Sequence, residues 1–310
     1  VTAILIVTPL IIRLCDSYGF PSRWLLSGSL IASNLGGFST KWGDTPNIVE
    51  SRVWGLVTAD FTLEVMPANL IVLVVLVLFV VGLTIRTMVK EGGSSRMSAV
   101  AIARITSRFN EPVTVNSRLL LIGLVTLGGF ILGQAIWPQH QVVVGALTIF
   151  AAVVLEHDED RVSSLKSLGY DVYLTFAAVF VVSGCMEASW VGETLQAVIR
   201  DSGPSPWAIT TTGYLGTMFS EAASWATAAA ERIHPLDNSH TAAWALGGGI
   251  CAGSSSILTA ASAGIILHEE SRRFKEGKHA VTFRRYLAFG LASSLFMLAF
   301  YTFYFSFFPF

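Results

Sequence analysis

The chain has 310 residues, of which 53% are hydrophobic and 13% are charged, and its mean hydropathy of +0.61 indicates a membrane protein and excludes an ordinary soluble domain. The formal net charge is −1 at pH 7 and the basic residues form no groove-sized patch, which excludes a nucleic-acid partner. The three cysteines are widely separated and form no C-x-x-C pair, which argues against a disulfide framework or a metal site.

The chain opens within an apolar stretch, "VTAILIVTPLIIRL", that has neither the charged segment nor the small-residue cleavage site of a signal peptide. We therefore expect it to belong to a helix, with an N-terminal part of the molecule preceding Val1. Five later runs approach or reach the length of about 20 residues that crosses a bilayer, and the two shortest need help from their flanks. These runs are residues 65–85, 119–136, 142–155, 172–186 and 286–310.

The polar sequence "SNLGGFSTKWGDTPN" at residues 33–47 interrupts an apolar segment. The apolar part before it forms about 17 Å of helix, which reaches only the middle of a bilayer. We expect this helix to end at Gly36 and Gly37, and a second helix to start with Thr45 as N-cap and Pro46 in the first helical position. Non-helical backbone at this depth must be buried in protein or line an aqueous cavity.

A similar interruption occurs near the other end of the chain, where residues 244–246 lead into "GGGICAGSSS" and "ILTAASAGIIL" resumes a helix. Two Gly-interrupted segments in corresponding positions of two halves are typical of secondary transporters built from inverted repeats. The C-terminal end of a half-helix suits a cation and the N-terminal end suits an anion. The sequence thus predicts an all-α, polytopic membrane protein with inverted repeats and two broken transmembrane helices, whose partners are the lipid bilayer and a small ion.

The predicted crossings place each connecting segment on one or the other side of the membrane. Most of the 20 Lys and Arg residues fall on the segments of one side, which predicts that these segments are cytoplasmic. We expect a single transporter domain over residues 1–310. Within it, residues 1–85 end a first inverted repeat, residues 86–118 form a cytoplasmic connector and residues 119–310 form the second repeat. The predicted cytoplasmic segments are residues 13–23, 86–118, 156–171 and 268–285.

The first interruption resembles the signature of an ion-transporter superfamily that includes arsenite permeases, citrate and dicarboxylate carriers, and a class of sodium/proton antiporters. That signature has the form A-S-N-x-G-G-x-x-T-x-x-G-D/T-P-P-N, and this sequence departs from it at Thr45, where proline is usual. The resemblance implies re-entrant hairpins beside the broken helices, and a sodium site at Ser33, Asn34 and Thr40. The substrate- or ion-binding residues that it implies here are Ser33, Asn34, Gly36, Gly37, Thr40, Asp44 and Asn47.

The second interruption resembles the superfamily's second signature less strictly, through Gly248, Gly253, Ser254, Ser255, Ala261, Ser262 and Gly264. Of these residues, Gly253, Ser254, Ser255 and Ser262 are the binding candidates. The resemblance covers most of the chain. It makes Val1 and Thr2 the last residues of a first hairpin tip, so that the chain is N-terminally truncated relative to the superfamily.

The second hairpin tip, "SEAASWAT" at residues 220–227, departs most from the superfamily, which shows S-D/N-N-x-P followed by A-T. Its binding candidates are Ser220, Glu221 and Thr227. The Asn side chain of the superfamily's hairpin tip is absent here, so the resemblance supports a second sodium site in this sequence less strongly. Because a buried carboxyl group can exchange a proton, we hypothesise that coupling is at least partly to protons through Glu221.

Three features have alternative interpretations. Asp44 either binds an ion or only caps the following helix. Lys41 either offsets Asp44, contacts an anionic substrate or reaches the interface with its long side chain. Four glycines in residues 123–133 indicate close helix packing, which could include a homodimer contact.

The expected function is secondary active transport by alternating access, in which a sodium ion or proton is coupled to a small anion of the citrate/dicarboxylate or oxyanion class. A sodium/proton antiporter is the alternative, since Asp44 and Glu221 are the acids that it would need. A membrane-embedded hydrolase is disfavoured because no nucleophile elbow or H-E-x-x-H motif occurs, so we expect no enzyme and no cofactor apart from bound sodium. The expected location is the inner (plasma) membrane of a prokaryotic-type cell, as a multi-pass protein.

Overall fold

The computed structural model describes residues 2–18, 20–90, 117–137, 141–155, 178, 181, 185, 189–273, 279–308 and 310. These residues form helices and connecting turns, with no strand among them, which confirms the all-α prediction. The chain forms two compact units, one of residues 1–105 and 177–310 and the other of residues 106–176. Most of the predicted spanning run at residues 172–186, the predicted cytoplasmic segment at residues 156–171 and most of the predicted connector at residues 86–118 lie outside the described residues.

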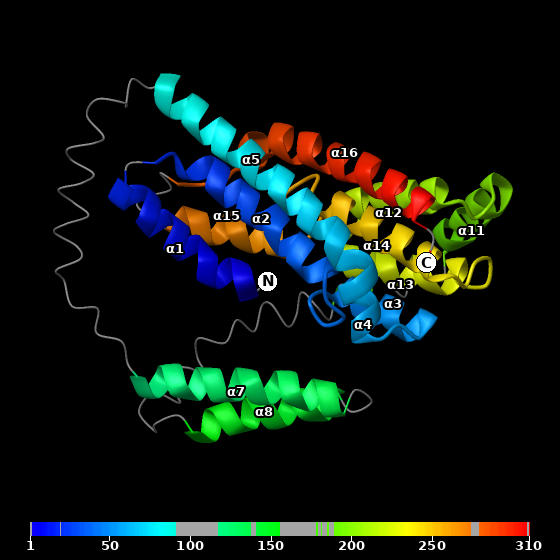
Figure 1. Cartoon of the computed structure of the whole chain (residues 1–310), viewed down its shortest axis with the longest axis horizontal. Helices are drawn as coiled ribbons and strands as arrows, with labels where there is room; N and C mark the ends of the chain where they lie inside the picture. Colours follow the sequence, from blue (N-terminus) through cyan, green and yellow to red (C-terminus); the bar gives the residue numbers. More distant parts are fainter. Residues whose placement is uncertain are drawn as a thin grey trace. The chain divides into compact units, whose positions relative to one another are not determined.

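The smaller unit contains two apolar helices, α7 (Ser117–Ile136) and α8 (Gln141–Leu155), at the predicted runs. They pack closely, since a methyl group on Gly133 would lie 2.6 Å from a methyl carbon of Val144. The described helices of the larger unit (Figure 1) are α1 (Thr2–Tyr18), α2 (Ser22–Phe38), α3 (Thr45–Trp54), α4 (Thr58–Asp60), the π-helix η1 (Phe61–Val65), α5 (Met66–Lys90), α11 (Trp190–Ser202), α12 (Pro206–Phe219), α13 (Ala222–Ile233), α14 (His240–Ser254), α15 (Ser262–Arg273) and α16 (Phe283–Phe307).

Two of the described helical segments are long and apolar enough to cross a membrane, Thr58–Lys90 and Phe283–Phe307. The first contains the predicted run at residues 65–85, and the second contains most of the run at residues 286–310. Helix α5 buries only one stripe, from Ala68 to Val80. Large apolar side chains such as Leu70 and Leu78 are exposed on its other faces, as expected of a helix in contact with lipid.

Both broken helices are present, but their breaks lie later than the sequence predicts. Helix α2 continues through Gly36 and Gly37 to Phe38, and the first break covers residues 39–44. Helix α14 likewise continues through its three consecutive glycines, and the second break covers residues 255–261. In α14 close packing explains the presence of glycine, because a methyl group on Gly247 would lie 2.5 Å from the Phe38 ring.

Three contacts gather the described parts of three predicted cytoplasmic segments, those at residues 13–23, 86–118 and 268–285, at one end of the larger unit, which we name the Arg285 end. Arg23 donates to the Arg285 carbonyl (2.9 Å), and the Ser22 hydroxyl contacts His279 Nδ1 (2.8 Å). The Trp24 indole donates to the Thr87 hydroxyl (2.8 Å), which brings the end of α5 to the same place. This grouping agrees with the prediction that these segments lie on one side of the membrane.

The opposite end, which we name the Asp237 end, is defined by two contacts of tryptophan indoles. Trp54 donates to the Asp237 carbonyl (3.4 Å), and Trp244 donates to Glu64 Oε2 (2.5 Å). The C-terminal Phe310 joins this end through its backbone N–H, which donates to the Thr241 hydroxyl (2.7 Å). The two ends together show the directions of the broken helices, of α5 and of α16.

The two broken helices run in opposite directions. Helices α2 and α3 lead from the Arg285 end to the Asp237 end. Helix α14 starts at the Asp237 end, and α15 continues to the Arg285 end, beside residues 279–285. The long helix after each broken helix runs opposite to that broken helix, so α5 and α16 are antiparallel to each other. In both halves, the helix after the break packs against the helix that precedes the other broken helix, since α3 packs on α13 and α15 packs on α1 (Figure 1).

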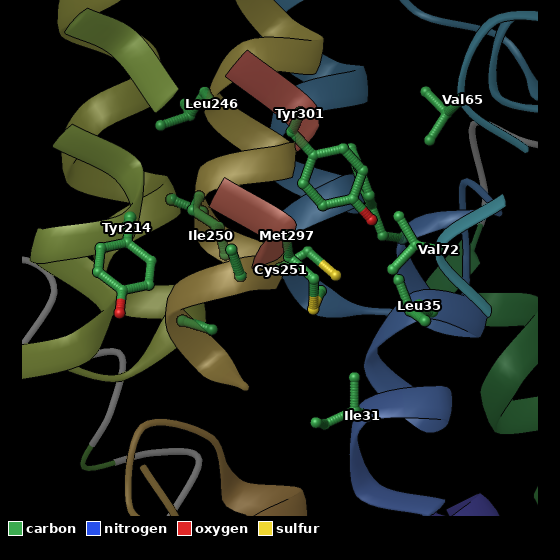
Figure 2. Packing of buried hydrophobic residues seen from close by; sticks show 14 of the residues in the cluster. Ile31, Leu35, Val65, Val72, Tyr214, Leu246, Ile250, Cys251, Met297 and Tyr301 are labelled. Carbon is green, nitrogen blue, oxygen red and sulfur yellow. The ribbon is translucent and has the colours of Figure 1, made fainter. Parts of the chain in front are cut away.

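The hydrophobic core lies between the broken helices and the long helices, where Ile31, Leu35, Val72, Met297 and Tyr301 point toward one another (Figure 2). A polar chain crosses this core. The Tyr301 hydroxyl donates to Asn69 Oδ1 (2.6 Å), and Asn69 Nδ2 donates to the Leu35 carbonyl (3.2 Å) and to Ser39 Oγ (2.8 Å). Residues of α5 and α16 therefore hold the C-terminal end of α2, where the first break begins.

Candidate ion-binding site

The first break is organised by the side chain of Asn47, which is 2% exposed. Its Nδ2 donates to the Gly37 carbonyl (2.8 Å) and to the Thr40 carbonyl (2.7 Å). Each of these carbonyls also accepts a backbone N–H, that of Thr40 (3.2 Å) for Gly37 and that of Gly43 (3.1 Å) for Thr40. Asn47, in the first turn of α3, thus holds the two half-helices together.

Two glycines allow the break to fold this tightly. The Gly43 N–H donates to the Thr40 carbonyl (3.1 Å), and the Gly43 Cα faces Gly37 so closely that an added methyl group would overlap the Gly37 carbonyl and the Thr40 hydroxyl. A methyl group on Gly37 would lie 3.2 Å from Asp44 Cβ. In contrast, Gly36 is exposed and has no atom within 4 Å of the position that a methyl group would take.

This difference predicts opposite effects of alanine at two neighbouring glycines. Gly43→Ala should destabilise the protein by about 1–3 kcal/mol, because the methyl group displaces the backbone that closes the break. Gly36→Ala should leave stability unchanged or raise it by up to about 1 kcal/mol, as expected in an exposed helical position. Thermal unfolding of the purified full-length variants measures both, and equal melting temperatures would contradict the role of Gly43.

Asp44, not Thr45, is the N-cap of α3, which corrects the sequence prediction. Its backbone is extended, its Oδ1 accepts from the Thr45 N–H (2.9 Å), and Thr45 and Pro46 occupy the first helical positions. An aspartate is a better cap than a threonine because its charge also favours the positive end of the helix. The structure therefore shows the capping role of Asp44, and a role in ion binding stays a prediction.

One hydrogen bond joins the two predicted signatures. Asn34 Nδ2 donates to Ser255 Oγ (3.0 Å), and both side chains are buried. Ser255 is the first residue of the second break, and its carbonyl accepts from the Tyr286 hydroxyl (2.7 Å). The first broken helix thus contacts the start of the second break directly, although the two residues are far apart in sequence.

The second hairpin consists of α12 and α13, with Ser220 and Glu221 at its tip. Glu221 is the N-cap of α13, and its Oε2 accepts from the N–H groups of Ala223 (2.7 Å) and Ser224 (3.3 Å). The tip lies near the first break, since α13 packs against α3 and the negative charge of Asp44 acts on Glu221. Two helix N-termini, each capped by an acid, therefore lie side by side.

Several predicted binding residues contact only their own helix through the hydrogen bonds that the structure records. The hydroxyls of Ser220, Thr227 and Ser254 donate to carbonyls three or four residues earlier. Gly253 serves packing, because a methyl group there would lie 2.5 Å from the Tyr214 carbonyl of α12. For the remaining candidates, the structure places Ser33 half-buried in α2, Thr40 exposed in the first break and Ser262 half-buried at the start of α15.

Glu50 is an acid that the sequence analysis missed. It lies in α3, is 0% exposed, and neither of its carboxyl oxygens has a hydrogen-bond partner among the described residues. A methyl group on Gly247 of α14 would lie 2.7 Å from Glu50 Oε2. The spacing of Asp44 and Glu50 in a short, interrupted segment was the signal available in the sequence, since acids at membrane depth are candidates for function by default.

Two other polar features lie away from the contact between Asn34 and Ser255. Lys41 donates to the Leu56 carbonyl (3.0 Å) and lies over the Trp42 ring, so its ammonium group is not paired with Asp44. Asp60, Glu64 and His240 form a half-buried cluster at the Asp237 end, where His240 Nδ1 and Glu64 Oε2 are 3.3 Å apart. This cluster connects η1 with α14.

A cavity of about 240 Å³ lies between α2, α5 and α16. Its lining is almost entirely apolar, with Ile31, Phe79 and Phe296 among the side chains that form it. An ion needs oxygen or nitrogen ligands to replace its hydration shell, so this cavity is not the ion site.

The citrate transporter family matches residues 1–249. The chain belongs to this family. This family member is 28% identical, over 294 residues, to an uncharacterised transporter of Mycobacterium tuberculosis, an alignment that covers 88% of this chain and 65% of the relative. It is also 28% identical, over 276 residues, to the magnetosome protein MamN of Magnetospirillum gryphiswaldense, covering 84% of this chain and 61% of the relative.

A shorter match joins this citrate transporter family member to the P protein of Mus musculus, at 38% identity over 80 residues, or 24% of this chain and 10% of that protein. No solved structure matches. The chain spans about two thirds or less of the length of these relatives. Family membership shows that the chain is an integral membrane protein of a transporter family.

Proposed function

We propose that this protein is the ion-binding part of a secondary transporter that moves a small anion of the citrate class together with protons. The observation that carries the proposal is the contact between Asn34 and Ser255, which joins two broken helices of opposite direction. Breaks of this kind place free helix ends inside the membrane, where they can replace the hydration of an ion.

The arrangement of the larger unit supports an inverted repeat. A helix, a broken helix and a long apolar helix follow one another as α1, α2–α3 and α5, and again as α13, α14–α15 and α16. The second series runs opposite to the first, and the exchange of packing partners between the halves is reciprocal. Alternating access then consists of a movement of one half against the other around the breaks.

Proton coupling has a chemical basis in the tip of the second hairpin. In the structure, Glu221 occupies the N–H groups of Ala223 and Ser224, which are the donors that a helix N-terminus would offer to an anion. An ionised Glu221 therefore competes with the anion, both for these donors and by charge repulsion. Protonation of Glu221 weakens its hold on the donors and removes the repulsion, so proton and anion bind together.

Asp44 acts in the same way at the N-terminus of α3, where it occupies the Thr45 N–H. Because Asp44 and Glu221 repel each other when both are ionised, the two caps favour the uptake of a positive charge between them. A sodium ion held by Ser33, Asn34 and Thr40 would be a second coupling ion in this scheme. Because Asn34 Nδ2 donates to Ser255, Asn34 Oδ1 is the atom of this amide that would bind the sodium ion.

A sodium/proton antiporter is the second candidate, and the acidic character of both caps favours it. Such a protein would move protons in response to a sodium gradient without any organic anion. Proton flux into vesicles that contain the full-length protein, under an imposed sodium gradient, separates the two functions. Flux in the absence of citrate would support the antiporter, and flux only in its presence would support coupled anion transport.

Glu221→Gln should abolish the pH dependence of citrate uptake. Glutamine keeps an oxygen that can accept from the helix N–H groups, but it cannot exchange a proton. We expect uptake that no longer rises when the outside is acidified, measured with labelled citrate and proteoliposomes of the full-length protein. Glu231→Gln, at an exposed position of the same helix, is the matched control and should keep the wild-type pH profile. An unchanged profile in Glu221→Gln would contradict the proposed coupling.

A further inference from the structure

Glu50 is a buried acid that takes no part in the proposed competition between the acidic caps and the anion for helix N–H groups. Its side chain is 0% exposed and lies between α3 and α14. Glu50 Oε2 and the Phe38 ring both approach Gly247 of α14, at 2.7 Å and 2.5 Å from the position that a methyl group there would take. Neither carboxyl oxygen has a hydrogen-bond partner among the described residues. An ionised carboxylate in such surroundings is strongly unfavourable unless a proton or a cation neutralises it.

The charged and ionisable neighbours do not supply that neutralisation. Asp44 and Cys251 are the groups that interact electrostatically with Glu50, and each carries a negative charge when ionised. On α13, which also packs against α3, Glu221 adds a further negative charge near Asp44, and Arg232 has other interactions. The known neighbours Phe38 and Gly247 are apolar, whereas a metal ion needs several oxygen ligands. A bound proton therefore fits this position better than a sodium ion.

The position of Glu50 links its protonation to movement. Helix α3 is the second half of one broken helix, and α14 is the first half of the other, so the contact of Glu50 with Gly247 lies between the two proposed repeats. If one repeat moves against the other, this contact opens and water reaches the carboxyl group. The group can then ionise, and it must take up a proton before the contact closes again.

We propose that Glu50 is a second proton-binding site of the transporter, which is loaded with a proton in the conformation described and releases it when α3 and α14 separate. This inference rests on the proposed function as a proton-coupled transporter. It differs from the role of Glu221, which competes with the anion for N–H donors. Glu50 contacts no anion site and carries only the proton.

Infrared spectroscopy of the purified full-length protein tests the bound proton without any transport. The wild type should show the carbonyl stretch of a protonated carboxyl group at neutral pH, and Glu50→Gln should lack part of this band, while Glu231→Gln should keep all of it. A Glu50→Gln spectrum with an undiminished band would overturn the proposal. Loss of the band on adding sodium would also overturn it, because the site would then hold a metal ion.

Transport of labelled citrate in proteoliposomes tests the role of that proton. In Glu50→Gln, uptake driven by a pH gradient should fall about tenfold or more, while exchange of labelled for unlabelled citrate at equal pH should continue, because exchange needs no net proton release. Retention of gradient-driven uptake would overturn the proposal. If the wild type carries no citrate but its infrared band is lost in Glu50→Gln, the citrate assignment fails and the proton site stands.

Discussion

Asn47→Asp should abolish transport and strongly destabilise the protein. The substitution keeps the shape of the side chain but replaces the Nδ2 donor with an oxygen, which then faces the carbonyls of Gly37 and Thr40 at hydrogen-bond distance. Two donated bonds become two repulsive contacts inside a buried site. Since each buried polar group left without a partner costs about 1–3 kcal/mol, we expect a loss of several kcal/mol.

A matched control for this substitution is Asn238→Asp, which makes the same chemical change at an exposed position between α13 and α14. It should leave the melting temperature and the uptake rate near those of the wild type. Asn47→Ala should lie between the two aspartate variants, because it removes the donor without adding an acceptor. Wild-type stability in Asn47→Asp would show that the first break does not depend on this side chain.

The sequence predicts the existence of both broken helices but not their boundaries. Glycine is normally read as a helix terminator, because it has low helix propensity and caps helix ends readily. In this fold Gly37, Gly247 and Gly249 stay helical, because each faces another backbone or a large ring at a distance that excludes a side chain. The decisive contacts come from segments far away in sequence, which local rules do not include.

The restart of the first half-helix shows a smaller error of the same kind. Proline at the first or second helical position is a reliable sign, and Pro46 is the second residue of α3. The choice between Asp44 and Thr45 as the cap depends on one residue of register, which propensity alone does not determine. Asp44 is the cap because its backbone is extended, while Thr45 is already helical.

Glu50 could have been found from the sequence, whereas its lack of a partner could not. An acid six residues after Asp44, in a segment too short to span the bilayer, is unusual enough to single out. That its carboxyl group meets Phe38 and Gly247, and no donor among the described residues, depends on the packing of α3 against α14. The hydrogen bond between Asn34 and Ser255 is likewise a result of tertiary structure, although both residues were selected beforehand.

The predicted number of spanning runs is larger than the number of described helices that meet a length criterion. Five runs were predicted, and two described helical segments meet the length and composition of a spanning helix. Broken helices fail such a length criterion because each half counts as a separate helix, and α2 has 17 residues and α14 has 15. A length criterion therefore does not count a helix that is interrupted by a break.

Gly249→Val should prevent the larger unit from folding correctly, because α12 and α14 make their closest approach at this residue. A Cβ atom on Gly249 would overlap the Thr210 carbonyl, and on the facing helix a Cβ atom on Gly213 would lie 2.8 Å from the Leu246 carbonyl. The obstacle in both cases is backbone, which cannot turn aside as a flexible side chain can. We expect destabilisation of about 3 kcal/mol or more, seen as a lower melting temperature and loss of citrate uptake.

The matched substitution is Gly82→Val in α5, at an exposed helical position with no atom within 4 Å of the added carbon. Both variants replace a helical glycine with the same β-branched residue, so differences in helix propensity cancel. Only the contact between α12 and α14 differs between them, and this contact places the hairpin tip that carries Glu221. If the two variants had the same melting temperature, the packing of α12 on α14 would not be what fixes the position of that tip.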